Sequence, residues 1–332
     1  MRAWFACLLA LLLGACSDSR AGPDMDTILA DEPADVLSAY GLFVDSEASR
    51  PARGVVPYDL INPLFSDYSQ KERHVYVPKG KIARWSYDEV LGFPVGSVLV
   101  KSFSYPETGR IETRLLIHKR DGWAAYPYVW NDDHSEALYT PIGKKIPIEI
   151  ADDQGVLHQI TDSVPNQNQC KTCHQAGDAI TPIGPKARNL GAGQIEFWEE
   201  LGLLRNPPRA FGIVPAAHMD FATIPARARA YLDINCAHCH KADGSASNSG
   251  LWLDLNEESP VKLGIGKHPT AAGRGAGQFT RVIEPGSPET SILAYRMAST
   301  QAGVAMPELG RYLVDKDGVA LVHQWILEMQ DD

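Results

Sequence analysis

The chain has 332 residues, 44% of them hydrophobic, and a formal net charge of −10 at pH 7. A chain of this length and composition can bury substantial cores and has room for two or three domains, which argues against a largely disordered protein. No run of lysine and arginine breaks the acidic balance, so nucleic acid is not an expected partner, whereas a basic redox protein would be attracted.

The first residues have the pattern of an export signal. Met1 and Arg2 precede an apolar run over residues 3–13, which is too short to span a bilayer, and small residues lead to Cys16. We therefore expect residues 1–15 to be a signal peptide and residues 16–30 a polar tether. The segment LLGAC also resembles the bacterial lipobox, which implies that Cys16 is acylated. Ser17 in place of aspartate then favours an outer-membrane lipoprotein facing the periplasm, and a soluble periplasmic protein is the alternative.

Residues 31–160 have the alternation typical of β-strands. In RIETRLLIH, residues 110–118, apolar and polar residues alternate, Asp121 and Gly122 then predict a hairpin turn, and residues 123–130 predict the partner strand. KIPIEI and VLHQI predict a second hairpin. We expect an antiparallel all-β sandwich or barrel.

Two polar or aromatic clusters in this region have alternative interpretations. An aromatic row, Trp123, Tyr126, Tyr128 and Trp130, could bind carbohydrate or relay electrons, but aromatic residues of one strand parity more often form a core. The neighbouring acidic and histidine residues could bind a metal, although a solvated loop is the simpler interpretation; they are Asp132, Asp133, His134 and Glu136.

The later half of the chain changes to short helices separated by glycine and proline. IPARARAYLDIN, residues 224–235, predicts a helix that runs directly into Cys236, and residues 315–329 predict an amphipathic closing helix. We expect this half to be mainly α, with a first segment over residues 161–223 and a second domain over residues 224–332.

The pattern Cys-x-x-Cys-His occurs twice, at residues 170–174 and 236–240. A lone Cys-x-x-Cys suits zinc or thiol exchange equally well, but a histidine directly after both pairs points to c-type haem. Two thiols form thioethers with the porphyrin and the histidine is the proximal iron ligand. The sequence therefore predicts two covalently bound haem c groups, attached at Cys170, Cys173, Cys236 and Cys239, with His174 and His240 as proximal ligands. The mainly α parts of the chain are accordingly expected to be cytochrome c-like haem domains, with the first haem segment over residues 161–223 and the second haem domain over residues 224–332.

Candidate sixth ligands lie further along the chain. Met306, between Ala305 and Pro307 just before the closing helix, is the candidate for the second haem, whereas Met297 fits a core position. For the first haem the candidates are His218 and Met219, of which we take Met219. The alternative is that neither residue binds iron and that both are solvent-facing residues of a linker. A backbone carbonyl of ITPIGP, residues 180–185, is expected to accept the other ring N–H of His174.

These segments together resemble a family of exported bacterial di-haem c-type cytochromes, in which a β-rich N-terminal half precedes two Cys-x-x-Cys-His segments. The similarity covers residues 55–330 and includes NPLFSDYSQKERHVYVP, FPVGSVLVKSF and ITPIGPKARNL. It implies haem binding and almost nothing about a substrate. From the haem sites we expect periplasmic electron transfer with a soluble cytochrome or an oxidoreductase as partner, a carrier rather than a catalyst. The alternative is a haem-dependent oxidoreductase, peroxidase-like or a substrate oxidase, with an open first haem and a substrate or partner held by the β domain.

Overall fold

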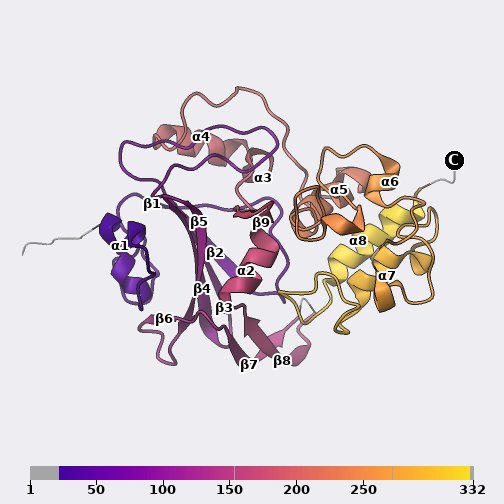
Figure 1. Ribbon diagram of the computed structural model, residues 1–332, viewed down its shortest axis with the longest axis horizontal. Coiled ribbons are helices and arrows are strands. Elements are labelled where there is room, and N and C mark those ends of the chain that lie inside the picture. The colour runs from indigo at the N-terminus through magenta and orange to yellow at the C-terminus, as the bar shows by residue number, and fades with distance from the viewer. Residues whose placement is uncertain (1–21, 153, 271, 330–332) are drawn as a thin grey trace, which may run out of the picture.

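A computed structural model describes residues 22–152, 154–270 and 272–329. Its centre is a six-stranded antiparallel sheet in which the strands follow one another in chain order (Figure 1). A separate hairpin pairs β7 with β8. The strands are β1 (Val55–Pro57), β2 (Gln70–Tyr76), β3 (Val98–Tyr105), β4 (Gly109–Lys119), β5 (Gly122–Trp130), β6 (Ala137–Tyr139), β7 (Lys144–Ala151) and β8 (Leu157–Val164), followed by the short β9 (Gln175–Ala176) and β10 (Ala179–Ile180).

The predicted hairpins are confirmed. Strands β4 and β5 pair with Lys119 opposite Gly122, and Gly122 has a φ of 129°, a conformation that glycine adopts without a side-chain clash. Strands β7 and β8 pair through the full length of KIPIEI and its partner. Period-two alternation and the turn residues were sufficient to place both hairpins.

The two faces of the sheet are covered by different helices. One face packs its aromatic and aliphatic side chains against Ile28 of α1 (Met25–Leu29) and Tyr40 of the 3₁₀ turn η1 (Leu37–Tyr40). This core includes Tyr126, Tyr128 and Trp130, so the core interpretation of that aromatic row is confirmed. The opposite face packs against α3 (Ala187–Leu190) and α4 (Ala192–Glu200), where Trp198 is fully buried.

The predicted fold class is wrong in both halves. Among the described residues, only the two-stranded hairpin of β7 and β8 packs against the main sheet, through Ile148 and Ile150. Helices and loops cover the rest of both faces, so the N-terminal part is neither a sandwich nor a barrel. No mainly α cytochrome domain is present in the later half either, and over the whole described chain only about 25% of residues are helical. Between residues 236 and 291, the longest described α-helix, α6 (Pro260–Leu263), has four residues. Frequent glycine and proline end each helix after a turn or two.

A second core lies beside the sheet in one lobe (Figure 1). Helix α5 (Ile224–Asn235), helix α7 (Ile292–Ala298) and helix α8 (Lys316–Leu327) pack together around Leu232, Val322 and Ile326, all fully buried. The two predicted helices of this region, over residues 224–235 and near the C-terminus, are therefore confirmed. The sequence patterns overestimated the amount of helix between these two helices.

The loop from β1 to β2 joins the sheet to the segments that carry the two cysteine motifs. Asn62 exchanges hydrogen bonds with Asn189, and the Phe65 amide donates to Asn235 Oδ1 at 2.9 Å. The buried Asp67 carboxylate accepts from the amides of Tyr312 and Leu313 at 2.7–2.8 Å. These contacts fix the loop against α3, the end of α5 and the segment before α8.

Candidate functional site

The first cysteine motif lies on helix α2 (Gln167–His174). Asn166 caps the helix and forms a capping box with Gln169, which satisfies two backbone amides at the N-terminus. Cys170 and Cys173 are three residues apart and so lie on one face of the helix, and His174 ends it. The cap therefore sets where the helix begins and which way the two thiols point.

A cavity of about 310 Å³ lies between α2 and the sheet. Cys170, Cys173 and His174 line it on the helix side, and β2, β3 and β4 line the other side. The His174 Nδ1 donates to the Thr181 carbonyl at 2.8 Å, which confirms the expected carbonyl from ITPIGP. Burial lowers the pKa of His174 to about 4, so the imidazole is neutral and its Nε2 lone pair is available to a metal.

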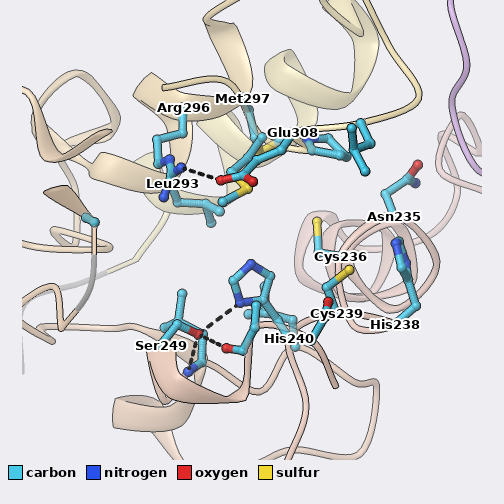
Figure 2. Close-up of a pocket in the computed structure, with 18 of the residues that line it drawn as sticks. Asn235, Cys236, His238, Cys239, His240, Ser249, Leu293, Arg296, Met297 and Glu308 are labelled. Atoms are coloured by element: carbon cyan, nitrogen blue, oxygen red, sulfur yellow. Dashed lines mark hydrogen bonds and ion pairs between the residues drawn. The ribbon is translucent and has the colours of Figure 1, made fainter. Parts of the chain in front are cut away.

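The second motif follows helix α5 without a break. Thr223 caps the helix, Cys236 ends it, and the chain then turns so that the His240 amide donates to the Cys236 carbonyl at 3.0 Å. This turn brings the two thiols and the imidazole together at the mouth of a second cavity of about 420 Å³ (Figure 2).

In the second cavity, His240 faces helix α7. Figure 2 shows its ring directed towards Leu293 and Met297, with Cys236 and Cys239 at one edge. The ring Nδ1 lies 3.1 Å from Ser249 Oγ, whose own proton goes to the Ala246 carbonyl, so the imidazole is the donor. Burial lowers the pKa of His240 to about 4. His240 thus presents a neutral Nε2, as His174 does.

Met306 also lines this second cavity, as predicted for a sixth ligand. Its amide donates to the Arg296 carbonyl at 3.0 Å, and its carbonyl accepts from Arg311 Nη2 at 2.7 Å. The same guanidinium also donates to the Arg296 and Met297 carbonyls at the end of α7, so it links the loop that carries Met306 to that helix. Met297 lines the cavity too but is 6% exposed within the core, in agreement with its predicted place.

His218 and Met219 do not reach the first cavity. His218 is exposed and Met219 is half-buried in a turn where its amide bonds to Ala216, and neither lines either cavity. The sequence offered them only because they lie between the two motifs. The one histidine besides His174 that lines the first cavity is His238, which sequence reasoning missed, since it lies inside the second motif.

The two cavities meet along a common wall. Phe65, Cys173, His238, Pro307, Glu308, Leu309 and Arg311 line both. The Cys239 Sγ lies 3.8 Å from the Thr172 carbonyl, and the Cys173 and Cys239 thiols share a hydrogen bond that raises the pKa of Cys173 and lowers that of Cys239. Two motifs far apart in the sequence are therefore in contact in space, which their spacing did not predict.

The donor set of each cavity fits a covalently attached porphyrin. Two thiols and a neutral imidazole with an engaged Nδ1 face a mainly apolar space, and apolar cavities of 300–1,000 Å³ are typical of cofactor sites. Within residues 22–152, 154–270 and 272–329, no group of three or more His, Cys, Asp or Glu side chains is arranged to hold a metal ion directly. The loop with Asp133 and His134 closes on its own hydrogen bonds to Ser135 and Asn131.

Comparisons with protein-family models, curated proteins and solved structures found no match for this chain. The predicted signal peptide and the acylated Cys16 lie outside the described residues. In the described part of the chain, no helix is both long and apolar enough to cross a membrane. Function must therefore be argued from the two cavities.

Proposed function

We propose that the chain is a di-haem c-type cytochrome that transfers electrons in the periplasm. The observation that carries the proposal is the repetition of one arrangement: each Cys-x-x-Cys-His closes on its own apolar cavity and directs a neutral imidazole into it. Haem supplies one-electron iron chemistry when bound.

The chain's own residues would hold and tune the two groups. Cys170 and Cys173 would anchor the first, and Cys236 and Cys239 the second. The Thr181 carbonyl and Ser249 Oγ orient the two imidazoles by accepting their Nδ1 protons. Met306 as sixth ligand would give the second site a higher potential than a bis-histidine site, because a soft thioether favours the reduced iron.

Contact between the motifs supports electron transfer as the function. Cys173 lines both cavities and lies beside Cys239, so the two groups that these thiols would hold would be attached close to one another. An electron accepted at one site could pass to the other without leaving the protein. We also propose that the redox partner is a soluble cytochrome or an oxidoreductase. The chain itself would be a lipoprotein, anchored through Cys16 on the periplasmic side of the outer membrane.

Haem content of cysteine variants tests the proposal. The chain would be produced in a host with cytochrome c maturation, and the C170A/C173A and C236A/C239A variants would each retain one haem of two. Lys171, exposed within the first motif, supplies the control, because K171A keeps the attachment pattern and should retain both. A reduced spectrum without a c-type α band in the unaltered protein would contradict the proposal.

A second function is favoured by one observation at the first cavity. None of the described residues lining it is a methionine, and Met219 lies elsewhere. If His238, which also lines this cavity, did not bind the iron, the open iron would make the protein a haem-dependent oxidoreductase. Binding of cyanide at one haem of the two would support this function, and an unchanged spectrum would favour the electron carrier.

A further inference from the structure

A row of three cationic side chains crosses the sheet where it faces the first cavity. Arg73 of β2 is the partner of Lys101 of β3, and Lys101 is the partner of Arg114 of β4. All three line the cavity. Two residues away on each strand, on the same face of the sheet, the equivalent row consists of Val75, Leu99 and Leu116. These three side chains pack in the core. Like charges directly opposite on neighbouring strands repel one another, so the row is not explained by sheet stability.

Among the described residues, a carboxylate partner is found for only one of the three side chains. Arg114 donates to both oxygens of Glu112, at 2.9 and 2.5 Å. Arg73 is 7% exposed, its Nη2 has no hydrogen-bond partner among the described residues, and its Nη1 reaches only the Lys71 carbonyl at 3.4 Å. Lys101 has no hydrogen bond or ion pair with any described residue, and its Nζ lies 4.7 Å from the Phe103 ring. Two basic side chains thus face the cavity without a carboxylate partner among the described residues, and burial together with the nearby Arg73 charge lowers the pKa of Lys101 well below its ordinary value.

We propose that Arg73 and Lys101 form an anion site on the sheet wall of the first cavity and that its ligand is a carboxylate or a similarly small oxyanion. A buried guanidinium with a free N–H group and an adjacent ammonium are the donors that bind such anions most strongly. Cross-strand partners lie about 4.5–5.5 Å apart at their Cα atoms, so both side chains can reach one small anion or two neighbouring carboxylates.

The anion has two possible sources of the same chemistry. One is the propionate pair of a haem attached at Cys170 and Cys173; this source rests on the proposed function. Arg73 and Lys101 line the same cavity as Cys170 and Cys173. A porphyrin held by those thiols would carry its propionates into this cavity, where the two basic side chains could bind them. The other source is a free anion that enters the cavity.

The test compares R73Q and K101M with K81Q, which alters an exposed lysine. The holoprotein would be titrated electrochemically, and its oxidised spectrum followed with added formate and nitrite. If the ligand is the pair of attached propionates, R73Q and K101M should lower the potential of the first haem and K81Q should not. Added formate or nitrite should then leave the spectrum of the unaltered protein unchanged. A free anion predicts a spectral change in the unaltered protein and an affinity at least about tenfold weaker in the variants.

The result that overturns the site is a pair of variants indistinguishable from K81Q in both potential and anion affinity. A haem-free product would instead contradict the proposed function and leave the anion site testable. In that case formate would raise the melting temperature of the unaltered chain, and K101M would melt higher on its own and lose that response. A haem-free chain whose melting ignores both formate and K101M would overturn the anion site as well.

Discussion

Asp233 holds the two haem segments together, and its replacement by asparagine gives a sharp prediction. The carboxylate is 1% exposed on α5, three residues before Cys236. It accepts from Arg188 Nη2 at 2.9 Å and from Lys186 Nζ at 3.0 Å, both from the segment of the first motif, and from the Leu255 amide at 3.2 Å. The Arg188 side chain is 6% exposed, so D233N would leave a buried cation without its counter-charge.

Breaking one side of a buried ion pair costs about 3–5 kcal/mol of the free energy of unfolding. We expect a loss of that size for D233N in urea unfolding of the holoprotein at pH 7. The exposed D220N should change stability by less than about 0.5 kcal/mol. Adding R188M to D233N should recover part of the loss, because it removes the orphaned charge. A loss below about 1 kcal/mol for D233N would refute the reasoning.

The ion pairs also set a pH dependence. Burial alone would raise the pKa of Asp233, but Lys186 and Arg188 outweigh it and hold the pKa below its ordinary 3.8. A carboxyl whose pKa is lower in the folded state stabilises the fold above its unfolded pKa and loses that contribution as pH falls through the folded value. The stability gap between the unaltered protein and D233N should therefore shrink in acid.

Three further predictions concern single side chains. Burial raises the pKa of Asp162 to about 7, so folding favours its protonated form. In urea titrations, the gain in stability of D162N over the unaltered protein should therefore grow from pH 4 to pH 7. A gain that does not change with pH would contradict this. M306L should convert the second haem to high spin in EPR, whereas M297L should not; the reverse result would reassign the ligand. S249A removes the acceptor of the His240 Nδ1 proton and should raise the potential of the second haem; an unchanged potential would count against that hydrogen bond.

Local sequence signals predicted local structure well. The alternation over residues 110–130 placed β4 and β5 because side-chain period and turn chemistry are properties of neighbouring residues. The helix over residues 224–235 was predicted to the residue from the segment that runs into Cys236, and the structure adds that Thr223 caps it. A carbonyl of ITPIGP was expected to accept from His174 because this segment follows soon after the motif, but only the structure identifies it as that of Thr181.

Long-range features could not be read from the sequence. Alternation in β4 shows that one face of the sheet is buried, but it does not show whether a second sheet or helices cover the opposite face. In the structure, α3 and α4 pack against that opposite face. The contact of Cys173 with Cys239 depends on how α2 and α5 pack, which no spacing encodes. The cationic row also arises only when strand register aligns Arg73, Lys101 and Arg114, each unremarked in its own segment.

The most direct test of the account is the intact mass of the chain purified from a host that matures c-type cytochromes. Covalent attachment at both motifs predicts a polypeptide carrying two haem masses that resist acid–acetone extraction, reduced to one in C170A/C173A and in C236A/C239A. A correctly folded chain with the mass of the bare polypeptide and four reactive thiols would contradict it.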